Sequence, residues 1–103
     1  MGNQEHSAKL KEGVEVWNSW RMENPDLVPN LHKARLSCAN LRGAILRDTR
    51  CEGVDFKGAD LREANLGGID LHRGEANFRE ADLRRANLRM ANLREADFQA
   101  ANL

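Results

Sequence analysis

Residues 76–103 read ANFRE-ADLRR-ANLRM-ANLRE-ADFQA-ANL, a pattern of small residue, Asn or Asp, and Leu or Phe that recurs every five residues. The same pattern extends back to Pro29, with mostly polar residues in the last two places of each repeat. A helix would turn successive leucines by about 140°, and strand alternation has a period of two, so neither element fits a period of five. The chain must turn once per repeat, which predicts a solenoid of short extended segments.

The central residues of the repeats are expected to point inward and form the core. Asn or Asp before most centres is expected to hydrogen-bond to nearby turn backbone. The centres are Leu31, Leu36, Leu41, Leu46, Cys51, Phe56, Leu61, Leu66, Leu71, Phe78, Leu83, Leu88, Leu93, Phe98 and Leu103.

The stretch from Pro29 to Leu103 resembles the pentapeptide-repeat family, in particular its bacterial, cyanobacterial-like members. The resemblance implies an all-β fold, a right-handed quadrilateral parallel β-helix with four repeats per coil and about four coils over residues 29–103. The preceding motif Trp17-Asn18-Ser19-Trp20-Arg21, followed by Asn24-Pro25, is similar to the lead-in of some bacterial members.

One interval in the repeat is too long. Leu71 and Phe78 are seven residues apart where five are expected. With four repeats per coil, like positions recur every 20 residues; Phe56 and Phe78 are 22 apart, and Phe78 and Phe98 are 20 apart. A two-residue bulge within 72–75 would therefore keep these three rings stacked on one face of the coil.

Residues 1–28 are expected to form a leader and an α-helical cap over the first coil. One helix is predicted over residues 7–23, with Ser7 as its N-cap. Leu10, Val14 and Trp17 fall on one stripe at helical spacing, so this face should pack against the open end of the solenoid.

Composition argues against several functions. The chain has 16 Lys and Arg residues and 16 Asp and Glu residues, so it lacks the basic excess of a typical nucleic-acid-binding protein, and nucleic acid is not expected to be a partner. The resemblance also raises a DNA-mimicking modulator of a topoisomerase such as gyrase, but residues 31–103 hold 13 basic and 11 acidic side chains, which disfavours it. No membrane span is expected, and a cytoplasmic location with Cys38 and Cys51 as free thiols is predicted.

The expected function is a non-enzymatic protein–protein interaction or structural module, with no catalytic, cofactor or metal site. The column of His32, Glu52 and His72 is interpreted as a solvated face. The last coil is expected to be an apolar interface for a homodimer or for stacking on a neighbouring chain, formed by Leu93, Phe98 and Leu103. A surface column of arginines on two successive faces is a weaker candidate for binding anions or a partner: Arg42, Arg62 and Arg84 on one face, and Arg47 and Arg89 on the next.

Overall fold

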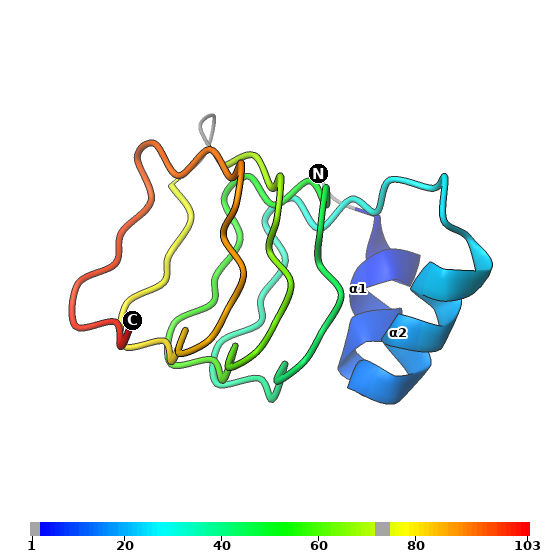
Figure 1. Ribbon diagram of the computed structural model, residues 1–103, viewed down its shortest axis with the longest axis horizontal. Helices are drawn as coiled ribbons and strands as arrows, with labels where there is room; N and C mark the ends of the chain where they lie inside the picture. Colours follow the sequence, from blue (N-terminus) through cyan, green and yellow to red (C-terminus); the bar gives the residue numbers. More distant parts are fainter. Residues whose placement is uncertain (1–2, 72–74) are drawn as a thin grey trace.

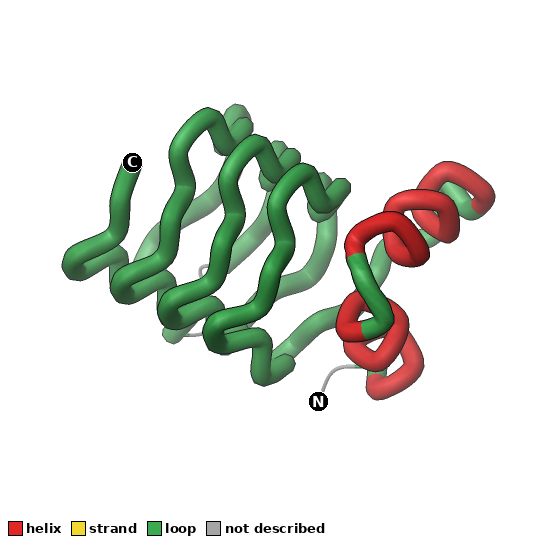
Figure 2. The backbone as a smooth tube through the Cα atoms, turned by 90° about the horizontal axis from the view of Figure 1, so that it is seen from below, coloured by secondary structure: helices red, strands yellow, loops and turns green. Residues whose placement is uncertain are grey.

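The computed structural model describes residues 3–71 and 75–103 and shows two short helices at one end of a rod of stacked coils (Figure 1). Helix α1 spans Gln4–Lys11 and helix α2 spans Val14–Glu23. The coils follow one another toward the end of the rod that lies opposite the helices (Figure 2). Within the described coils, pairing takes the form of isolated parallel β-bridges rather than strands of several residues.

The β-bridges define the register of the coils. Asn30 pairs with Arg50, 20 residues later, so four repeats complete one coil. Asp55 pairs with Asn77, 22 residues later, so the register continues past the insertion. The predicted bulge falls on residues 72–75, of which 72–74 lie outside the described residues.

Each corner of the coil is a tight turn, which explains why extended strands are absent from the described coils. In the first turn the Ala34 N–H donates to the Leu31 carbonyl at 2.9 Å, and Lys33 takes a left-handed φ of 60°. The Asn30 Oδ1 accepts from the His32 N–H at 3.0 Å, which confirms the predicted role of the Asn/Asp position. Two residues of each five-residue repeat therefore form the middle of the turn.

The interior is a column of apolar side chains, as the repeat centres predicted. Phe56 and Phe78 are fully buried, their ring centroids lie 5.0 Å apart, and the rings of Phe78 and Phe98 lie 4.8 Å apart. The predicted phenylalanine stack is confirmed. Cys51 is buried, Cys38 is exposed, and both thiols are free.

The prediction of one helix over residues 7–23 is wrong. Gly13, at a φ of 129°, separates α1 from α2. Ser7 lies inside α1 instead of capping it; Asn3 is the N-cap, and its Oδ1 accepts from the Glu5 N–H at 2.8 Å. Asn and Ser are comparable N-cap residues, so the sequence alone did not distinguish them.

The buried face of the helices was predicted in part. Leu10 and Trp17 are buried and Val14 packs partly against the core. Val16 is 42% exposed, whereas Arg21 is only 3% exposed. Neither helix in the described part of the chain has the length and apolar character needed to cross a bilayer.

Candidate functional site

Helix α2 pairs with the first coil through side chains that take the place of a neighbouring strand. The Trp17 indole N–H donates to the Ile45 carbonyl at 2.8 Å. The Asn18 side chain donates to the Gly43 carbonyl at 3.1 Å and accepts from the Ile45 N–H at 2.9 Å. A single carboxamide thus provides both a donor and an acceptor to an edge that otherwise has no strand beside it.

Arg21 extends this pairing with a buried guanidinium. It donates to the carbonyls of Ile45 and Arg47, both at 2.9 Å, and to the Thr49 hydroxyl at 3.1 Å. Burial lowers the pKa of Arg21. Sequence reasoning missed this residue; the available signal was its position four residues after Trp17, on the same face of the helix.

Helix α1 pairs with another side of the same coil. The Asn3 N–H donates to the Asn30 carbonyl at 3.0 Å, and the Asn30 N–H donates to His6 Nδ1 at 3.0 Å. The His6 ring lies 5.1 Å from the Trp20 ring, and burial lowers the pKa of His6. The imidazole therefore acts as an acceptor in its neutral form.

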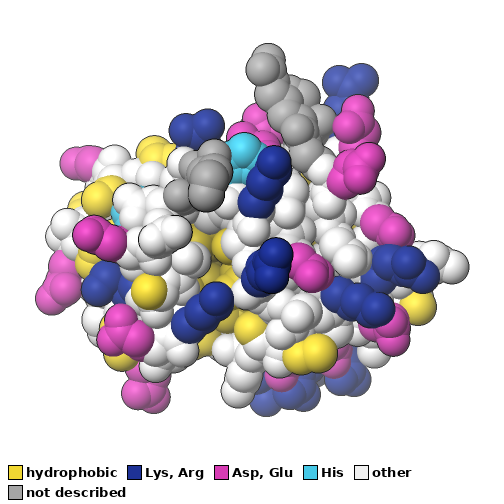
Figure 3. Space-filling model, turned by 180° about the vertical axis from the view of Figure 1, so that it is seen from behind, with side chains coloured by type: hydrophobic (Ala, Val, Ile, Leu, Met, Phe, Trp, Pro, Cys, Tyr) yellow, Lys and Arg dark blue, Asp and Glu magenta, His cyan; other side chains and the backbone are white. Residues whose placement is uncertain are grey.

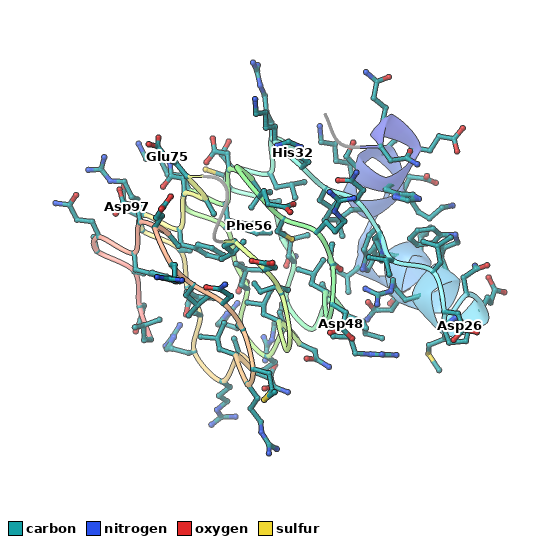
Figure 4. All side chains as sticks on the ribbon, turned by 90° about the horizontal axis from the view of Figure 1, so that it is seen from above. Asp26, His32, Asp48, Phe56, Glu75 and Asp97 are labelled. Carbon is teal, nitrogen blue, oxygen red and sulfur yellow. The ribbon has the colours of Figure 1, made fainter. Side chains whose placement is uncertain are left out.

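At the opposite end of the rod, core positions are open to solvent. Leu93 and Phe98 are half-buried, and Leu103 is 74% exposed, whereas Phe78 one coil earlier is fully buried. Figure 4 shows Phe56 inside the coils, with Asp48 and Asp97 toward the outside. The predicted interface residues occupy three successive faces of the last coil, and within the described residues no coil covers them.

Three arginines of the predicted column are held in ion pairs. Arg62 and Arg84 each bind the aspartate two residues earlier in a bidentate pair, with shortest distances of 2.7 Å to Asp60 and 2.6 Å to Asp82. The Arg62 hydrogen bond lowers the pKa of Asp60 to about 2. The Arg42 Nε contacts Glu63 at 2.7 Å.

The other two arginines lie on the next face of the coil, as the repeat register predicts. Gly67 stands between Arg47 and Arg89 on that face. No ion pair joins either one to a described carboxylate. Of the five arginines, Arg42, Arg62 and Arg84 are thus the ones held in ion pairs with described carboxylates.

The histidine column gives no metal-binding arrangement in the described part of the chain. Across residues 3–71 and 75–103, no three His, Cys, Asp or Glu side chains are grouped to hold a metal ion. His32 lies on the rod surface (Figure 4). His72 lies outside the described residues.

Comparison with known proteins identifies the repeat. The family description "Pentapeptide repeats" matches residues 30–73 and 75–103, in 8 copies. The chain belongs to the pentapeptide repeat family. Pentapeptide repeat proteins adopt a right-handed quadrilateral β-helix, and the four-repeat coil and 20-residue bridges of this chain agree with that fold.

Two solved structures are similar to the chain. One is the pentapeptide repeat protein Rfr23 from the cyanobacterium Cyanothece 51142, with 26% identity and a TM-score of 0.50, over 66% of this chain and 52% of that one. The other is a pentapeptide repeat protein from the Arabidopsis thaliana thylakoid lumen, with 25% identity and a TM-score of 0.30, over 69% and 59% of the two chains. The chain thus spans between half and three fifths of these proteins. No curated protein matches it.

Proposed function

We propose that this pentapeptide repeat protein is a non-enzymatic module that binds other protein chains through the open face of its last coil. Members of the family are generally not enzymes. The observation that carries the proposal is the exposure of core positions there: Leu103 is 74% exposed and Phe98 half-buried, whereas their equivalents Leu61 and Phe56 are fully buried. A partner covering this face would bury apolar surface and pair backbone groups, both of which favour association.

The simplest partner is a second copy of the same chain. Identical surfaces related by a two-fold axis are the commonest route to a homo-oligomer. Two last coils facing each other would extend the phenylalanine stack of Phe78 and Phe98 across the interface, where rings already lie 4.8 Å apart. A neighbouring chain of another kind could dock on the same face.

Light scattering across a dilution series tests this interface. The native chain should show a mass that rises with concentration, and Phe98→Lys should shift it to the monomer while keeping the native circular dichroism. Arg79→Lys, an exposed change one coil earlier, is the control. A native chain that stays monomeric at high concentration contradicts the proposal, as does a folded Phe98→Lys variant that still associates.

We also propose that α1 and α2 cap the solenoid. The location that we propose for the protein is the cytoplasm. The hydrogen bonds from Asn3, Trp17, Asn18 and Arg21 to the first coil support the cap. Removing residues 1–24 should expose the first coil and cause aggregation. A soluble, monomeric truncation with unchanged circular dichroism from the coils would contradict it.

A further inference from the structure

Within the described residues, the helical segment pairs with two of the four sides of the first coil. The sides at Asn30 and Ile45 receive hydrogen bonds from the helical segment. On the two remaining sides, the backbone N–H and C=O of Arg35 and Asn40 that face away from the second coil have no partner within the described residues. These two sides form an open backbone edge, which is a template for pairing with another extended segment. We refer to residues 34–42 as the open edge.

A cleft of about 610 Å³ lies between the helices and the open edge. Its apolar walls come from the end of α1, the start of α2 and the first coil: Leu10, Val14, Leu36, Ala39 and Leu41. Figure 3 shows hydrophobic side chains at the bottom of a hollow between the helical end and the coils, with Lys and Arg side chains around it. Leu10, Leu36 and Leu41 are already buried, so the apolar surface that remains beside the unpaired backbone groups is that of Val14 and Ala39.

The charges around this region favour an acidic ligand. Lys11 and Arg42 line the cleft, and Lys33 lines the adjoining hollow beside the N-terminal end of α1. Glu15 is the one carboxylate among the residues that line these two hollows. Lys11 and Lys33 take part in no ion pair with a described carboxylate, whereas Arg42 is paired with Glu63 at 2.7 Å. Lys11 and Lys33, against Glu15, thus leave a small positive excess beside the open edge although the whole chain is neutral.

We propose that the open edge binds an acidic peptide of a partner protein, which bends at the corner between the two sides and pairs with the first coil on both of them. Backbone pairing supplies the attraction, and alternate side chains supply specificity, as in other cases of strand addition. One face of the peptide places small apolar side chains over Val14 and Ala39, which are partly exposed. Its acidic side chains lie near Lys11.

The second coil shows the geometry that the peptide would repeat. On that side of Asn40, the Leu41 N–H donates to the Asp60 carbonyl at 2.8 Å, and the Asp60 N–H donates to the Ala39 carbonyl at 2.9 Å. On the open side, the Asn40 N–H would donate to a peptide carbonyl, and a peptide N–H would donate to the Asn40 carbonyl. Few hydrogen bonds are available on each side, so binding is expected to be weak and reversible.

Amide hydrogen exchange of the full chain, followed by NMR, reads this site directly. In the free protein the Arg35 and Asn40 amides should exchange faster than those of Asn30 and Ile45, which donate to His6 and Asn18. The probe is a synthetic heptapeptide that alternates aspartate and valine. Its addition should slow exchange at Arg35 and Asn40, and a probe N-methylated at alternate residues should not do so.

Two matched charge reversals complete the test. Lys11→Glu should weaken probe binding by about two- to fivefold, the effect of one exposed ion pair. Arg94→Glu makes the same charge change on an exposed residue of the last coil and should leave binding unchanged. Unaltered exchange at Arg35 and Asn40 in millimolar probe would overturn the proposal, and so would equal effects of the two substitutions or equal binding of a lysine–valine probe.

This inference rests on the proposed function only in taking the chain to be a protein-binding module. The two sites lie at opposite ends of the rod (Figure 1). Self-association is measured as the mass of the native chain and of the Phe98→Lys variant. Peptide binding at the open edge is measured as amide exchange at Arg35 and Asn40. Failure of either test therefore leaves the other result standing.

Discussion

At the scale of single residues, the turns place many ordinary side chains in the left-handed region. Four glycines take φ values of 67° to 75° at the third turn position, and nine other residues take 57° to 68° there. The left-handed region costs an L-residue about 1–2 kcal/mol. A hydrogen bond to the next coil offsets part of this cost, as where the Lys33 N–H donates to the Glu52 carbonyl at 2.9 Å. The non-glycine residues are Lys33, Cys38, Asp48, Glu63, Glu80, Arg85, Met90, Glu95 and Ala100.

Substituting two of the turn glycines should separate backbone strain from crowding. Gly43 has a φ of 75° and open space where a Cβ would stand, so Gly43→Ala should cost about 1 kcal/mol of unfolding free energy. Gly68→Ala should cost more, because its Cβ would also meet the Asp48 carboxylate. Urea unfolding measures both. Equal stability of Gly43→Ala and the native chain would show that the turn carries no such strain.

The unfolding free energy lost when one ring of the phenylalanine stack is removed should depend on how deeply that ring is buried. Phe78→Ala empties the middle of the stack and should cost about 3–5 kcal/mol. Phe98→Ala should cost clearly less, since this ring is half-buried and the space it leaves is open to water. Chemical denaturation of both variants under dilute, monomeric conditions gives the comparison. Equal losses would contradict the burial argument.

At the scale of elements, the helical segment supplies single side chains where the solenoid lacks a coil. Leu10 and Trp17 were correctly predicted to be buried, but they belong to α1 and α2, so the single stripe at helical spacing holds only within α2, for Val14 and Trp17. The break at Gly13 was not predicted, since an isolated glycine is tolerated inside many helices. The burial of Arg21 was also missed, because a charged residue is normally assigned to the surface and only the carbonyls of the first coil make its burial favourable.

The hydrogen bond between Asn30 and His6 should make the stability of this junction depend on pH. Burial lowers the pKa of His6 below its ordinary 6.5, so the unfolded chain binds more protons near that pH. The neutral His6 imidazole makes its full contribution to stability above pH 6.5, and this contribution is lost as the pH falls through the folded-state pKa of His6. Glu5, which favours protonation, and Lys9, which opposes it, are the charged neighbours.

Thermal unfolding at several pH values tests that dependence. The native chain should lose stability as the pH falls below 6.5, and exchange at the Asn30 amide should quicken over the same range. His6→Gln should show a flatter profile, because an amide oxygen can accept from the Asn30 N–H without titrating. A native and a His6→Gln profile of the same shape would contradict the role of the imidazole.

At the scale of the whole molecule, the five-residue period was sufficient to predict a solenoid, and the family resemblance supplied the four repeats per coil. A period of five requires a turn in every repeat, and the spacing of Phe56, Phe78 and Phe98 fixed the register across the insertion. The open edge at Arg35 and Asn40 could not be predicted, because it depends on where two separate helices sit over the first coil. Local periodicity determines how coils stack, whereas the packing of the helices depends on contacts between residues far apart in sequence.

The balance of charge over the rod predicts that the protein does not act as a DNA mimic. A duplex presents about one negative charge per 1.7 Å of axis, so a mimic needs a continuous acidic face. Here the carboxylates of Asp60, Asp82 and Glu63 are neutralised by neighbouring arginines at 2.6–2.7 Å. The sequence as a whole carries 16 basic and 16 acidic residues. In a supercoiling assay, gyrase should therefore be neither inhibited nor protected by micromolar protein. Inhibition at that concentration or below would show that the shape of the coil, rather than its charge, is what the topoisomerase recognises.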